Sequence, residues 1–176
     1  MNIKRQDVLV VLKMLACGER KATFEQLGKE LGLSASEANE AFRRACRVGL
    51  LRQADGTPVK VAIAEFLIHA LKFVLSTSPR GRTRGIPTGY AAPPLSQHFN
   101  PVSDDPDMPV WPDPEGQHAG LEVVPLCRSA PRAALRDPLL YEWLVLADAM
   151  RGVGKARERE LAESIIRERL GYNETG

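Results

Sequence analysis

The sequence predicts a mainly α-helical protein, in which three short N-terminal helices and a short β-hairpin precede a long proline-rich irregular arm and C-terminal helices. Two observations predict this fold class. Near both ends of the chain, apolar residues recur at helical spacing between capping residues and glycines. Between these regions, twelve of the thirteen prolines fall within residues 79–138. Proline disfavours the interior of a helix, so regular helix is largely excluded there.

The first predicted helix covers residues 4–17 and stops at Gly18. The second and third helices each open with a capping box, in which a Ser or Thr is followed three residues later by Gln or Glu. The boxes are Thr23 with Gln26 and Ser34 with Glu37, and the closing glycines are Gly32 and Gly49. Three short helices joined by tight turns are therefore expected.

A short hairpin and a fourth helix are expected next. Leu50 and Leu51 lead through the polar turn QADGTP to residues 59–61, and this pattern predicts a two-stranded β-wing. Residues 62–75 are apolar on most faces, so the helix predicted there should lie between two surfaces. We expect this helix to form a dimer or interdomain interface.

The rest of the chain divides into an arm and a helical hairpin. The arm contains apolar residues such as Ile86, Tyr90 and Trp111, so we expect it to pack against another surface and not to extend freely into solvent. Two helices follow, at residues 138–150 and 155–170. The expected organisation is a domain at 1–62, a linking helix at 63–75, the arm at 76–136 and a helical hairpin at 137–171.

Charge is distributed unevenly although the net charge is only +2. Residues 1–52 hold ten Lys and Arg against six Asp and Glu, and residues 66–103 hold four basic residues and no acid. Residues 104–122 hold six acids and no Lys or Arg. A basic N-terminal part is compatible with a nucleic-acid partner.

Cysteine usage and hydropathy bear on the compartment. The three cysteines are far apart and match neither a disulfide framework nor a metal pattern, so reduced thiols in a cytoplasm are expected. No apolar stretch reaches the roughly 20 residues that a membrane span needs. We therefore expect a cytoplasmic protein without a membrane partner.

Residues 24–51, FEQLGKELGLSASEANEAFRRACRVGLL, resemble the helix-turn-helix of winged-helix regulators such as the MarR-like family. Leu27 and Leu31 would bury the second helix, and Gly32 would permit the tight turn. The resemblance implies a DNA-binding domain over residues 3–62, with the third helix in the major groove and the wing on the backbone. The C-terminal part is faintly similar to regulators and antitoxins encoded beside toxin or defence genes.

The third helix supplies the candidate DNA-binding residues. With its apolar stripe inward, the residues that face outward are Ser36, Glu37, Asn39, Glu40, Arg43, Arg44 and Arg47. Ser36, Asn39 and Arg43 suit base edges, whereas Arg44 and Arg47 suit phosphates. Glu37 and Glu40 could each accept a hydrogen bond from cytosine or form an ion pair with an arginine one turn away.

The arm carries a second basic feature, Arg80, Arg82 and Arg84, spaced two apart among Gly, Thr and Pro. An extended segment of this kind can lay arginines along phosphates or into a narrow minor groove. The same arginines could instead pair with the acidic stretch at residues 104–115. Both interpretations stay open.

No catalytic or metal-binding pattern is present. The three histidines lack metal-ligand spacing, and no cysteine lies in a nucleophile motif. The acids of residues 104–115 lack the spacing and the glycine position of a calcium loop. We expect neither an enzyme nor a cofactor.

The resulting hypothesis is a sequence-specific transcriptional regulator, a dimeric repressor that binds double-stranded DNA. It could repress its own operon, which would also encode a partner, as antitoxins do. A protein partner would bind through the proline-rich arm or the C-terminal helices. The alternative is a winged-helix interaction subunit or adaptor in a larger assembly, without sequence-specific DNA binding.

Overall fold

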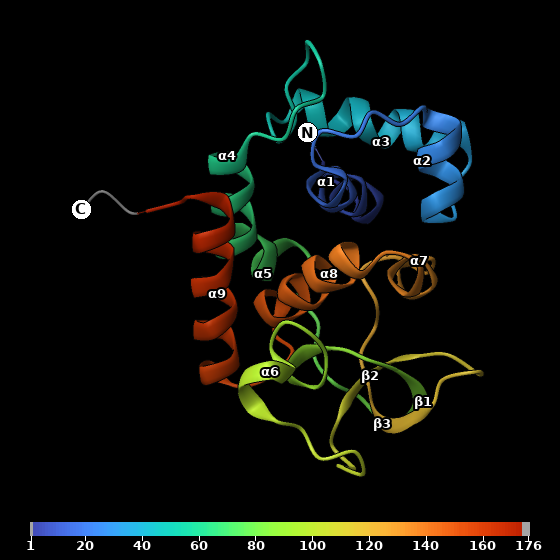
Figure 1. The fold of residues 1–176 in the computed structure, drawn as a ribbon, viewed down its shortest axis with the longest axis vertical. Coiled ribbons are helices and arrows are strands. Elements are labelled where there is room, and N and C mark those ends of the chain that lie inside the picture. The colour runs from blue at the N-terminus through green and yellow to red at the C-terminus, as the bar shows by residue number, and fades with distance from the viewer. Residues whose placement is uncertain (1, 174–176) are drawn as a thin grey trace. The chain divides into compact units, whose positions relative to one another are not determined.

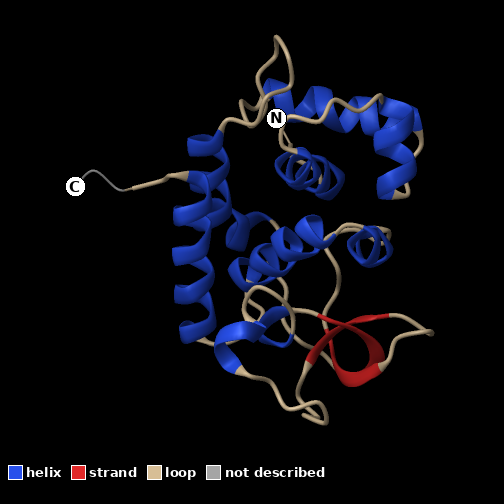
Figure 2. Ribbon diagram, viewed as in Figure 1, coloured by secondary structure: helices blue, strands red, loops and turns tan. Residues whose placement is uncertain are grey.

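The computed structural model describes residues 2–173 and, within them, is mainly α-helical with a small three-stranded sheet (Figures 1 and 2). The mainly-α prediction is confirmed. The described residues divide into two units. The first unit combines residues 2–63 with Leu126–Leu144, and the second combines Ala64–Pro125 with residues 145–173.

The first unit begins with three helices, α1 (Arg5–Cys17), α2 (Phe24–Leu31) and α3 (Ala35–Arg47), close to the predicted bounds. Both α1 and α2 pack against α3. The predicted capping box of α2 is formed, because Thr23 Oγ1 accepts from the Gln26 backbone at 3.1 Å and Gln26 Oε1 accepts from the Thr23 backbone at 3.0 Å. The three-helix prediction is confirmed by these elements.

The turn between α2 and α3 depends on Gly32. Its φ of +70° lies in the left-handed region, which side chains with a Cβ rarely adopt. A Cβ at Gly32 would also come within 2.9 Å of the Ser129 side chain. The glycine therefore allows both the tight turn and the close approach of the chain around residue 129.

The predicted β-wing is reduced to one bridge, between Leu51 and Pro58. The loop between them closes through Arg52 N, which donates to Thr57 O at 2.9 Å. Residues 59–61 were expected to form the second strand, but α4 begins at Lys60 (Lys60–Glu65). That expectation is wrong because the apolar pattern of residues 59–75 continues into a helix.

Residues far along the chain complete the first unit. Helix α7 (Ala130–Arg136) packs on α2, and the first half of α8 (Pro138–Arg151) belongs to the same unit. The buried ammonium of Lys13 on α1 lies 2.8 Å from Glu30 and 2.7 Å from Asp137. These two ion pairs connect α1 with α2 and with the residue that precedes α8, so the N-terminal helices share their core with residues 126–144.

Charge pairing in this cluster perturbs its acids and its lysine. Hydrogen bonds from Arg20, at 2.6 and 3.0 Å, and from Lys13 lower the pKa of Glu30 to about 2. Burial by itself would lower the pKa of Lys13, but hydrogen bonds to Asp137 and Glu30 outweigh it and the pKa is raised. All these groups are therefore charged at neutral pH.

The helix predicted at residues 62–75 is present but irregular. It consists of α4, a π-helical turn at Phe66–Ala70 and α5 (Leu71–Val74). Leu67 and Leu71 are buried, whereas Phe73 is 77% exposed and Val74 is also exposed. One end of the segment thus keeps an apolar side chain in solvent.

The arm at residues 76–136 is not irregular throughout, which corrects the prediction. It contains β1 (Arg82–Pro87), β2 (Pro109–Pro112) and β3 (His118–Glu122), with a 3₁₀ turn at Gly89–Ala91 and the short helix α6 (Ser96–Phe99) between β1 and β2. Strand β1 runs antiparallel to both β2 and β3, and β2 also pairs with β3, so the sheet closes on itself.

Glycine makes this closure feasible. A Cβ at Gly85 of β1 would lie 1.8 Å from the backbone oxygen of Trp111, and one at Gly120 of β3 would lie 2.0 Å from that of Met108. The three prolines within strands are the last residue of β1, Pro87, and the first and last residues of β2, Pro109 and Pro112. Strand ends tolerate proline, which has no N–H to donate to the ladder. The terminal helices are confirmed as α8 and α9 (Ala156–Leu170).

A buried charged pair organises the second unit. Asp148 and Arg151, both on α8 and each 1% exposed, form an ion pair of 2.7 Å. The other carboxylate oxygen of Asp148 accepts from Thr88 at 2.6 Å and from the indole of Trp111 at 2.7 Å. Arg151 donates to the backbone oxygens of Leu75 at 2.8 Å and of Val124 at 3.3 Å. The pair therefore ties α8 to four separate positions of the chain.

We expect Asp148→Ala to lower the free energy of unfolding by about 3–5 kcal/mol, because it leaves the Arg151 guanidinium buried without a counter-charge. Urea unfolding followed by circular dichroism measures the loss. The matched control is Asp104→Ala, which removes an exposed carboxylate and should change stability by about 0.5 kcal/mol or less. Equal stability of the two variants would contradict a structural role for the pair.

Candidate nucleic-acid interface

Helix α3 is held by its first turn and by small buried side chains. Ser34 caps it, since Ser34 Oγ accepts from the Glu37 backbone at 3.1 Å and Glu37 Oε2 accepts from the Ser34 backbone at 2.8 Å. This backbone hydrogen bond lowers the pKa of Glu37. The inner face is made of fully buried alanines, Ala38, Ala41 and Ala45. Glu37 is thus engaged in the cap, and the outer face of α3 is left to other residues.

The structure places the predicted residues of α3 in three environments. Ser36, Glu40, Arg43 and Arg47 are exposed, Asn39 is half-buried, and Arg44 is turned inward. The side chains of Arg43 and Arg47 form no hydrogen bond or ion pair within residues 2–173. The outer face of α3 therefore presents two guanidinium groups to solvent that are unpaired within the described residues.

Arg44 belongs to the interior and not to this surface. Its Nε lies 2.9 and 3.1 Å from the two oxygens of Asp7, and a second nitrogen lies 2.9 Å from the same carboxylate, which is fully buried on α1. Hydrogen bonding to Asp7 raises the pKa of Arg44 against the opposing effect of burial. Glu40 approaches Arg44 at 3.5 Å, which realises the predicted pairing one turn away. A phosphate contact by Arg44 would require breaking this pair.

An open hollow lies beside the exposed arginines. Its lining includes Phe24, Asn39, Phe42, Arg43, Arg47 and Gln53. The rings of Phe24 and Phe42 meet edge to face, with centroids 5.3 Å apart. This hollow combines an apolar floor with amide and guanidinium groups, the side-chain types that read base edges.

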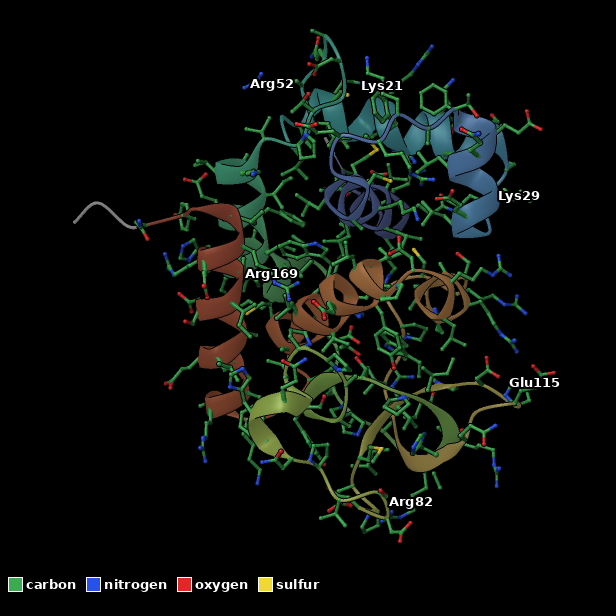
Figure 3. All side chains as sticks on the ribbon, in the orientation of Figure 1. Lys21, Lys29, Arg52, Arg82, Glu115 and Arg169 are labelled. Atoms are coloured by element: carbon green, nitrogen blue, oxygen red, sulfur yellow. The ribbon has the colours of Figure 1, made fainter. Side chains whose placement is uncertain are left out.

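The loop after α3 borders this hollow and contributes Arg52, a basic residue that belongs to no sequence motif. Gly56 packs on the Phe42 ring, leaving no room for a Cβ. Asp55 accepts from the Thr57 backbone at 2.9 Å, and this hydrogen bond, helped by the charges of Arg52 and Lys21, lowers its pKa. Lys21 and Arg52 are labelled in Figure 3. The signal that the sequence offered for Lys21 and Arg52 was that each is a basic residue at the border of a loop, outside any recognisable motif.

The arm arginines belong to the second unit. Arg82, labelled in Figure 3, donates to the backbone oxygen of Pro106 and lies 3.4 Å from Asp107, and both ionised side chains are mostly exposed. Arg80 and Arg84 are exposed on or beside β1, and their side chains form no ion pair within residues 2–173. One of the three arginines thus pairs with the acidic stretch, and two do not.

The acidic stretch itself is organised around Tyr90. Asp105 accepts from the Tyr90 hydroxyl at 2.6 Å, and burial together with this carboxylate raises the pKa of Tyr90 above its usual range.

Within residues 2–173, no three His, Cys, Asp or Glu side chains gather as a metal site would require. None of the described helices is both long and apolar enough to cross a membrane.

Comparison with family models, with curated proteins and with solved structures gives no match to this chain.

Two arginines of α3 allow a direct test of this division of roles. We expect Arg44→Ala to lower the free energy of unfolding by about 2–4 kcal/mol, because Asp7 is left buried with no counter-charge. Arg47→Ala is the matched control and should change stability by about 0.5 kcal/mol or less. Urea unfolding at pH 7 gives both values. An Arg44→Ala variant as stable as Arg47→Ala would show that the Asp7 pair does not fix α3.

Proposed function

We propose that the first unit is a winged-helix DNA-binding domain of the MarR-like type, and that the protein is a sequence-specific transcriptional regulator. The observation that carries the proposal is the outer face of α3, where Arg43 and Arg47 are exposed and unpaired within residues 2–173 beside the half-buried Asn39. Guanidinium groups free of internal partners are available to phosphates and guanine edges. A helix capped and packed on its opposite face can enter a major groove as a rigid body.

The surroundings of α3 add support. Arg52, in the loop that follows α3 where a wing would contact the DNA backbone, and Lys21, in the loop between α1 and α2, are both exposed. Their charges would be joined by Arg43 and Arg47 on the same unit. Neutralising several phosphates at once supplies the sequence-independent part of the affinity.

We further propose that the regulator acts as a homodimer and represses its own operon, as antitoxin-like regulators do. Phe73, 77% exposed, and its neighbour Val74 support an interface at α5. Burying such side chains against a second copy would remove apolar surface from water. A two-fold pair of α3 helices would read an inverted repeat.

Binding of the full chain to the DNA upstream of its own gene, compared with a random duplex of equal length, tests the proposal. We expect the upstream DNA to bind at least about 10³-fold more tightly at matched salt. Arg43→Ala should cost about 1–3 kcal/mol on the specific site alone. Arg47→Ala should weaken both duplexes about equally and lower the slope of log K against log salt by about one.

The matched control is Arg159→Ala, which removes an exposed charge from α9 and should leave both affinities unchanged. Equal affinity of the native protein for the two duplexes would favour the adaptor alternative instead. Fluorescence anisotropy gives the isotherms, and sedimentation of the protein–DNA complex gives the number of copies bound.

The arm arginines give a separate prediction. If Arg80, Arg82 and Arg84 lie on DNA, replacing all three with Ala should flatten the salt dependence of binding, because fewer counterions are released. Stability should hardly change, since the exposed Arg82–Asp107 pair contributes only about 0–1 kcal/mol. A salt titration of the triple variant measures the slope, and an unchanged slope would leave the arm with a role inside the protein.

A further inference from the structure

Asn39 is the one group of the α3 surface that the fold leaves in an unfavourable state. Its Oδ1 is inaccessible to solvent and has no hydrogen-bond partner within residues 2–173. A buried carbonyl oxygen without a donor is rare, because it has lost its bonds to water and gained none in exchange. The Asn39 side chain forms no hydrogen bond within residues 2–173, so rotating it outward would break none.

The neighbours of Asn39 show which groups would surround its amide if the side chain turned outward. It lines the same hollow as the edge-to-face pair of Phe24 and Phe42. Phe24 begins α2 and is 36% exposed, so part of its ring is open to a ligand. Arg43 follows Asn39 by one helical turn and lines the hollow too. The hollow thus offers an amide, an apolar wall and a cation next to each other.

The bases differ in how they fit this combination. In the major groove adenine presents the N6 donor and the N7 acceptor, and an asparagine side chain matches both at once. Guanine presents two acceptors and would leave Oδ1 without a donor. Cytosine has a donor but no methyl group, whereas the thymine paired with adenine places its 5-methyl beside the amide contact, within reach of an apolar wall.

We propose that Asn39 reads the adenine of an A·T pair in each half-site, while the exposed part of Phe24 contacts the methyl group of thymine. Arg43 then contacts the adjoining base pair. This inference rests on the proposed function, since it requires α3 in the major groove, and it assigns the base that the groove must present at one position.

The experiment uses the full chain and a random duplex pool, from which bound sequences are selected and read. We expect an A·T pair to be fixed at one position of each half-site. In the selected duplex, replacing that adenine by 7-deazaadenine removes N7 and should weaken binding about tenfold. Replacing the thymine by uracil removes the methyl and should weaken binding about threefold.

Two variants assign these effects to residues. Asn39→Ala should bind the native and the 7-deazaadenine duplexes equally, and Phe24→Leu should lose most of the difference between thymine and uracil. Arg159→Ala, on the exposed surface of α9, is the control and should keep both differences. Circular dichroism of each variant confirms that the helices are retained.

The outcomes separate this inference from the proposal on which it rests. A pool without any enriched sequence overturns both. An enriched site without A·T at a shared position, or an Asn39→Ala variant that still distinguishes 7-deazaadenine, overturns the role of Asn39 and leaves the DNA-binding function in place.

Discussion

The orientation of α3 depends on one buried carboxylate. Asp7 has no access to solvent, and its charge is balanced by the bidentate guanidinium of Arg44. A bidentate pair constrains direction as well as distance, so it fixes the rotation of α3 about its own axis relative to α1. Arg43 and Arg47 lie on the face of α3 opposite its buried alanines, so in this rotation they point outward. The surface that we assign to DNA therefore depends on an internal ion pair beside it.

In each unit the buried charges form ion pairs. The basic residue of each pair also bonds to backbone oxygens or to a second acid. An isolated buried charge would destabilise the fold, whereas a well-bonded buried pair mainly fixes the orientation of the segments that carry it. In the first unit Lys13 joins Glu30 and Asp137, and in the second Asp148 joins Arg151. Burial raises the pKa of Asp148, while the Arg151 charge and the Thr88 and Trp111 donors oppose that rise. Long-range connections of this kind hold segments that sequence order separates widely.

Local signals were readable from the sequence, and distant pairings were not. The capping boxes at Thr23 and Ser34 lie within four residues, so they predicted the starts of α2 and α3 correctly. Arg44 was assigned to phosphates because its partner, Asp7, is 37 residues away. The strands of the arm escaped prediction because their closure depends on Gly85 and Gly120, which in a sequence resemble turn signals. The orphaned oxygen of Asn39 likewise depends on tertiary packing, which periodicity does not describe.

The path of the chain has a consequence for biosynthesis. The first unit is discontinuous, since Leu126–Leu144 must return to the N-terminal helices, and α8 runs without a break from one unit into the other. A nascent chain that has only emerged as far as residue 63 still lacks Asp137, one of the two acids around Lys13. Contacts at such sequence separation slow folding, because the intervening loop must be ordered first. The N-terminal helices therefore reach their final stability only after most of the protein has left the ribosome, which exposes them meanwhile to chaperones and proteases.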